Sequence, residues 1–117
     1  MTLIDRIMFG GEKICLQKEH RPIAGYIEIN RETREIVVGR YCDSRGESSK
    51  IKSGGKFTRE EIEFTTISES GYTVDFKAIR NSRGWYSGTF EGQRQKGKIK
   101  VKIESCGRDV YKKMDAN

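Results

Sequence analysis

Apolar and polar residues alternate along the second half of the chain, and this pattern limits the fold more than any other feature of the sequence. From residue 72 to residue 79 the even positions are Tyr, Val, Phe and Ala, while most odd positions are polar. Residues 98–104 repeat the pattern, with apolar side chains at the odd positions. Successive side chains of a β-strand point to opposite faces, so this period predicts antiparallel strands with one buried and one solvated face.

We therefore expect four consecutive antiparallel strands over residues 57–104. The side chains expected on their buried face are Ile62, Phe64, Val74, Phe76, Phe90, Val101 and Ile103. The composition agrees with strands, since the chain has 13 Ile but only 2 Leu and 3 Ala. Residues that favour helices are therefore scarce, whereas β-branched and aromatic residues supply the core.

The first half of the chain contains further strand patterns, at residues 12–17, 22–30 and 34–41. In the first of these, Ile14 and Leu16 are the apolar side chains. The N-terminus differs, because Thr2 can cap a helix and Leu3, Ile4, Ile7 and Met8 lie on one side of a helical wheel. We therefore expect a short helix there, which ends at the Gly10-Gly11 pair.

The expected fold class is thus all-β, or β with one short N-terminal helix. We expect residues 1–117 to form a single antiparallel domain of seven or eight strands, with the last short strand at residues 108–113. Sequential strands joined by short turns favour a meander closed as a small barrel, with a β-sandwich as the alternative. Residues 43–55 are almost entirely polar and are expected to be one long loop.

Residues typical of catalysis and metal binding are sparse. His20 is the only histidine, and Glu19 and Arg21 beside it indicate a polar turn. The three cysteines, Cys15, Cys42 and Cys106, have no paired spacing of the kind zinc sites use. We therefore expect a protein that is not an enzyme and has no catalytic residues, no metal and no cofactor. No motif in the sequence identifies a family.

A barrel of this size offers its interior as one possible binding site. Inward aromatic side chains could line a cavity for a small apolar or aromatic ligand, with residues 43–55 as a lid. The residues expected to line that cavity are Tyr26, Tyr72, Phe76, Tyr86 and Phe90. The alternative is that a small barrel needs all of these side chains to pack its core.

Positive charge is concentrated near the C-terminus. Residues 94–113 contain eight Lys or Arg against two acidic residues, an excess equal to the net charge of +6 of the whole chain. A ladder of cations beside an aromatic ring can hold single-stranded nucleic acid. The basic face expected from this pattern consists of Trp85, Arg94, Lys96, Lys98, Lys100 and Lys102. Lysines on the outside of a sheet are also a common solvated surface, and this second interpretation stays open.

Self-association is the third possibility, because a chain with few apolar residues gains stability by pairing and two-fold dimers are the commonest oligomers. The expected partners are therefore a second copy of the chain, a small-molecule ligand or, as the less favoured case, nucleic acid. No apolar run is long enough to span a membrane. An odd number of cysteines favours reduced thiols, and with them a cytoplasmic location.

Overall fold

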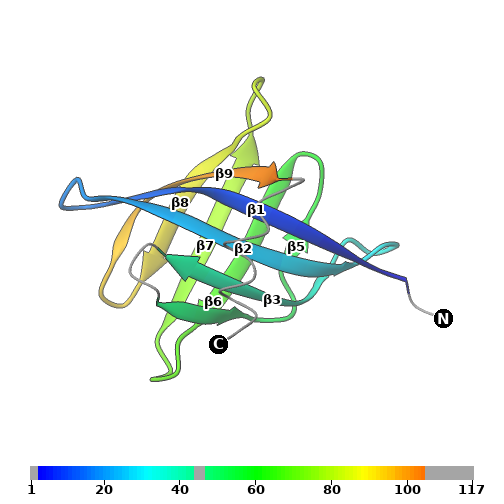
Figure 1. Cartoon of the computed structure of the whole chain (residues 1–117), viewed down its shortest axis with the longest axis horizontal. Coiled ribbons are helices and arrows are strands. Elements are labelled where there is room, and N and C mark those ends of the chain that lie inside the picture. The colour runs from blue at the N-terminus through cyan, green and yellow to red at the C-terminus, as the bar shows by residue number, and fades with distance from the viewer. Residues whose placement is uncertain (1–2, 44–46, 105–117) are drawn as a thin grey trace.

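The computed structural model describes residues 3–43 and 47–104, which form nine β-strands and no helix (Figure 1). The strands are β1 (Ile4–Cys15), β2 (His20–Asn30), β3 (Ile36–Asp43), β4 (Ser48–Ile51), β5 (Lys56–Phe57), β6 (Glu61–Ile67), β7 (Thr73–Arg80), β8 (Tyr86–Gly92) and β9 (Lys96–Glu104). The four consecutive strands expected over residues 57–104 are β6 to β9, which confirms that part of the prediction. The strand expected at residues 108–113 lies outside the described residues.

The strands follow one another around the sheet in chain order, and the sheet closes on itself. Its order is β4-β3-β2-β1-β9-β8-β7-β6-β5, and β4 pairs in addition with β6. That pairing joins eight strands into a closed antiparallel barrel and leaves β5 outside it. The expected barrel is therefore confirmed, and the alternative sandwich is not formed.

The expectation of an N-terminal helix is wrong. Residues 4–15 form β1, which pairs with β2 over eleven positions and with β9 over eight. Hydrogen bonds to a strand on each side stabilise the extended chain more than one isolated helical turn or two could. Gly11 allows close approach to β9 rather than ending a helix, since a Cβ there would lie 1.9 Å from the carbonyl oxygen of Lys100.

The segment expected to be one long loop, residues 43–55, contains β4. This strand pairs with β3 from Gly39 to Cys42, and its last two residues pair with β6. Ile51 is the one large apolar side chain of the segment and is 2% exposed. Its burial inside the barrel explains why a largely polar stretch forms the strand that completes the closure.

The interior is filled mainly by aromatic and branched side chains. Of the seven side chains expected on the buried face, six are buried and Ile103 is partly buried against the core. Phe64 stacks on Phe76 with ring centroids 4.8 Å apart, and Phe76 stacks on Phe90 at 5.7 Å. This aromatic row crosses β6, β7 and β8 and forms the centre of the packed core.

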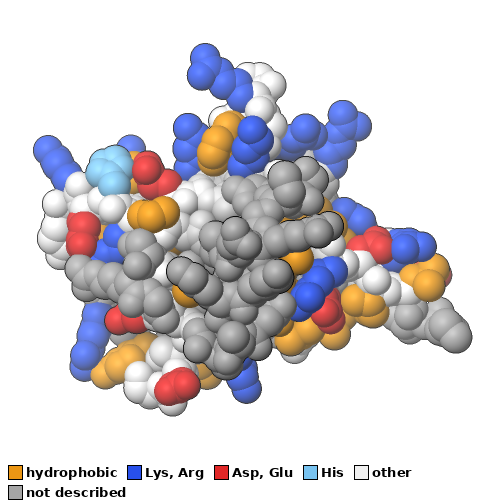
Figure 2. All heavy atoms as spheres, viewed as in Figure 1, with side chains coloured by type: hydrophobic (Ala, Val, Ile, Leu, Met, Phe, Trp, Pro, Cys, Tyr) orange, Lys and Arg blue, Asp and Glu red, His pale blue; other side chains and the backbone are white. Residues whose placement is uncertain are grey.

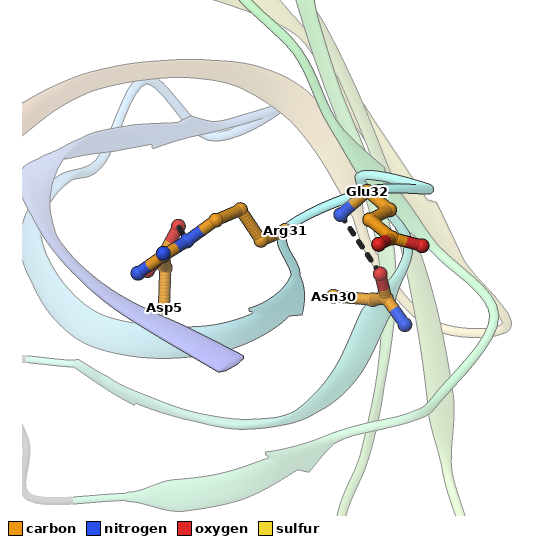
Figure 3. Close-up of polar contacts among 4 residues, drawn as sticks. All are labelled: Asp5, Asn30, Arg31 and Glu32. Atoms are coloured by element: carbon orange, nitrogen blue, oxygen red, sulfur yellow. Dashed lines mark hydrogen bonds and ion pairs between the residues drawn. The ribbon is translucent and has the colours of Figure 1, made fainter. Parts of the chain in front are cut away.

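The turn between β2 and β3 is fixed by side chains (Figure 3). Asn30 Oδ1 accepts hydrogen bonds from the backbone N–H groups of Glu32, at 2.9 Å, and Thr33, at 3.1 Å. Arg31 reaches back over β1, where its Nη2 lies 2.7 Å from Asp5 Oδ1. These contacts attach the beginning of β1 to the turn, so this end of the barrel is held by polar bonds as well as by packing.

Candidate functional site: the open end of the barrel

The two ends of the barrel are built differently. At the closed end, next to the β2–β3 turn, Ile36, Phe57 and Tyr86 are 1%, 6% and 4% exposed. Tyr86 Oη donates to the carbonyl oxygens of Thr58, at 2.9 Å, and Arg59, at 3.2 Å. Large side chains with satisfied polar groups therefore seal this end.

The open end is surrounded by the turns that follow β3, β6 and β8. Figure 1 shows the β6–β7 and β8–β9 turns at the lower left, away from the β7–β8 turn at the top. A cavity of about 1120 Å³ lies within these turns. Its apolar wall includes Tyr41, Ile67, Val74 and Phe76, and much of its rim is polar, with Arg94 and Gln95 on the β8–β9 turn.

A lysine lies inside the barrel at this end. Lys13 shares the inward face of β1 with Phe9 and Gly11, and it is only 5% exposed. Its Nζ donates to Gln95 Oε1 at 3.3 Å and lies 5.5 Å from the ring centroid of Phe90. The ammonium group thus sits between the aromatic core and the cavity.

Tyr41 brings a second polar group to the same wall. It is 5% exposed, its ring centroid lies 5.2 Å from that of Phe76, and its Oη has no hydrogen-bond partner among the described residues. Burial raises the pKa of Tyr41 above its usual value, and the neighbouring Asp43 carboxylate raises it further. The phenol therefore stays protonated and can donate a hydrogen bond.

Asp43 contributes the buried carboxylate of the open end. It is 7% exposed, and its Oδ1 accepts a hydrogen bond from the backbone N–H of Glu47 at 3.2 Å. This bond ties the end of β3 to the residues that lead into β4. The cavity wall therefore carries a buried cation, a buried anion and two buried hydroxyls, those of Tyr41 and Thr66.

The aromatic residues expected to line a ligand cavity lie in different places. Tyr72 and Phe76 line the cavity, and Phe90 is not part of its lining, although its ring centroid lies 5.5 Å from Lys13 Nζ. Tyr86 belongs to the closed end, and Tyr26 lies on the outside of β2 with the Arg6 guanidinium 3.8 Å from its ring centroid. The structure thus brings together part of the expected set.

Lys13 and Tyr41 were not among the residues expected at the site. The sequence pattern at residues 12–17 assigns the inward face to Ile14 and Leu16, yet Leu16 is 62% exposed and the odd positions of β1 point inward. Extending the alternation back from Lys13 to Phe9 is the one signal that would have placed the lysine inside. Tyr41 could have been placed in the same way, because it lies two residues after Gly39 and therefore shares the inward face of β3.

The four lysines of the expected basic face lie on β9 and Trp85 lies just before β8, whereas Arg94 is on the β8–β9 turn with its guanidinium 4.5 Å from the Tyr72 ring centroid. Figure 2 shows Lys and Arg side chains gathered at the top of the molecule, near the β7–β8 turn. Lys100 Nζ and Lys102 Nζ lie 4.7 Å and 5.5 Å from the Trp85 ring centroid. Lys96 is paired across the strands with Glu91. Lys100 and Lys102 therefore cover the Trp85 ring, on which a base would otherwise stack.

The residues considered for catalysis and metal binding are scattered. His20 is exposed, and its Nδ1 lies 3.1 Å from Glu12 Oε1. Within residues 3–43 and 47–104, no three His, Cys, Asp or Glu side chains gather as metal ligands would. The same residues include no helix long and apolar enough to cross a membrane.

Comparison with known proteins adds no relative. No protein-family model matches the sequence, and no curated protein or solved structure matches it. The geometry of the open end is therefore the basis on which a function can be proposed.

Proposed function

We propose that this protein is a small-molecule binding protein that holds its ligand in the cavity at the open end of the barrel. The proposal rests on the contrast between two parts of the barrel interior, one packed and one open. The core around Phe64 and Phe90 is packed and almost fully buried, yet about 1120 Å³ of space lies beside it. Ligand sites are concave, mostly preformed and lined by apolar side chains with a few buried polar groups.

The position of the cavity supports this function, because the mouths of β-barrels are frequent binding sites. Its volume of about 1120 Å³ is slightly above the range of about 300–1,000 Å³ that is usual for small-molecule pockets, so there is room for an organic ligand. An eight-stranded barrel has an interior wide enough to be filled by side chains or to hold one small ligand. In this barrel both cases occur, because side chains fill the closed end and space is left at the open end.

A variant that fills the cavity tests the proposal. Ser49 lines the cavity and lies opposite Tyr41 in the β3–β4 pairing. We expect Ser49→Trp to abolish ligand-induced stabilisation in a thermal-shift screen of small organic molecules. In the wild type a ligand at a hundred times its Kd adds about 2.7 kcal/mol to the free energy of unfolding.

Ser87→Trp is the matched control, because Ser87 is exposed on the outer face of β8. The control should respond to the same compounds as the wild type. A screen in which no compound stabilises the wild type, or in which Ser49→Trp responds as the control does, would contradict the proposal.

Self-association and nucleic-acid binding stay predictions. The basic face is exposed, but the contacts of Lys100 and Lys102 with Trp85 favour a solvated surface over a stacking platform. A dimer would be detected by the sedimentation of the purified chain, and it is compatible with a ligand in the cavity.

A further inference from the structure

The buried ammonium of Lys13 lacks a carboxylate partner. None of the ion pairs among the described residues includes Lys13, and its one hydrogen bond goes to the neutral amide of Gln95 at 3.3 Å. Burying a charge is unfavourable unless an opposite charge or several hydrogen bonds compensate it. The site therefore favours an anion beside Lys13.

The neighbouring charges do not already fill that role. Arg21 lies opposite Lys13 in the β1–β2 pairing, and its Nη2 is engaged by Glu19 Oε2 at 2.7 Å. Asp43 accepts a hydrogen bond from the backbone of the turn that follows it. No carboxylate among the described residues comes within ion-pair distance of Lys13 Nζ.

Tyr41 offers a second donor on the wall of the same cavity. Its hydroxyl is buried and has no partner among the described residues, so it can donate to a bound group without losing an existing bond. One ammonium and one phenol match a group with a single negative charge and two acceptor oxygens, which is the chemistry of a carboxylate. Val74 and Phe76 supply the apolar surface next to these donors.

We infer that the ligand of the open end is an amphiphilic organic carboxylate, whose head is bound by Lys13 and Tyr41 and whose apolar body lies against Phe76. This inference rests on the proposed function and adds the chemical class of the ligand. The carboxylate supplies the charge that Lys13 lacks, and the apolar body packs on the apolar part of the cavity wall.

Three probes with the same chain and different heads test the inference by isothermal titration calorimetry: dodecanoate, 1-dodecanol and dodecylammonium. We expect dodecanoate to bind the wild type at least about tenfold more tightly than dodecanol, as one hydrogen bond between charged groups would give. Dodecylammonium should bind most weakly, because its head would lie beside Lys13.

Lys13→Met keeps the length of the side chain and removes its charge. It should lower the affinity for dodecanoate about tenfold and leave that for dodecanol unchanged within about twofold. Lys100→Met removes the same charge from the outer face and should change neither affinity. If Lys13→Met does not fold, Tyr41→Phe takes its place and should weaken dodecanoate alone.

The outcomes distinguish a failure of the proposed function from a failure of the inference about the ligand class. If none of the three probes binds the wild type, the proposed function fails and the inference fails with it. If dodecanol binds as tightly as dodecanoate, the small-molecule function stands and the inference about its class is wrong. Equal losses of dodecanoate affinity in Lys13→Met and Lys100→Met would also overturn the inference, since attraction to net charge would then explain the binding.

Discussion

The closed and open ends of this barrel differ in how far their buried polar side chains are hydrogen-bonded. At the closed end the hydroxyl of Tyr86 donates to two backbone carbonyls and its ring packs 5.8 Å from that of Phe57. At the open end, among the described residues, the hydroxyl of Tyr41 is buried without a partner, and Lys13 has no carboxylate to neutralise its charge. A buried polar group that is satisfied stabilises the fold, whereas an unsatisfied one costs stability and, under the proposed function, is a donor available to the ligand.

The largest expected difference between the ends concerns packing. Phe57→Ala should lower the free energy of unfolding by about 3–5 kcal/mol, because it opens a hole in a sealed part of the core. Tyr72→Ala, at the rim of the open end where Tyr72 is 39% exposed, should cost less than about 1 kcal/mol. Urea denaturation of both variants measures the two losses, and equal losses would mean that the ends are not distinct.

A matched pair of hydroxyl deletions comes next. Tyr86→Phe leaves two carbonyl groups without their donor and should cost about 1–2 kcal/mol. Tyr41→Phe removes a hydroxyl that no described residue bonds, and it should leave the stability unchanged or slightly higher at neutral pH. If Tyr41→Phe were as destabilising as Tyr86→Phe, the Tyr41 hydroxyl would have to be satisfied in solution.

Alkaline pH sharpens the same comparison. The pKa of Tyr41 is raised in the folded protein by burial, so above pH 10 the unfolded chain loses this proton while the folded chain keeps it. The free energy of unfolding should then fall with rising pH by about 1.4 kcal/mol per unit from this tyrosine. Tyr41→Phe should flatten the decline between about pH 10 and 11.5 relative to the wild type. Parallel curves for the two proteins would show that Tyr41 ionises as freely in the folded protein as in the unfolded one.

The strand positions could be predicted from the sequence where polar and apolar residues alternate over a long stretch, as in β7 and β9. The hydrophobic period is ambiguous for the short apolar run that ends at Phe9. This run forms a strand because β1 pairs with β2 on one side and with β9 on the other. The site was harder to predict, because a lysine in an alternating pattern is assigned to solvent. Lys13 points inward because the register of β1 requires it, and the register depends on β2 and β9, which are distant in the sequence.

The cavity itself has no local signal. It results from the closure of the barrel, which rests on two residue pairs between β4 and β6. Val74 and Ala78 share the inward face of β7, yet Val74 lines the cavity and Ala78 does not. Position along the strand separates them, and alternation reports only the face of the sheet.

The smallest expected effect is on the outer surface, where the basic face provides the contrast to the buried lysine. Changing Lys98, Lys100 and Lys102 together to Gln should leave the melting temperature unchanged within about 3 °C, because exposed charges contribute little to stability.

If these lysines serve only as a solvated surface, the wild type should not be retained on single-stranded DNA or RNA at physiological salt. Retention of the wild type that the triple variant loses, with a flatter dependence on salt, would instead assign a nucleic-acid function to this face. Trp85→Ala distinguishes the two cases further: a stacking platform would lose about 1–3 kcal/mol of binding free energy, whereas a ring covered by Lys100 and Lys102 has none to lose. We expect the solvated surface, because a cation with free access to water needs no partner, while the buried ammonium of Lys13 does.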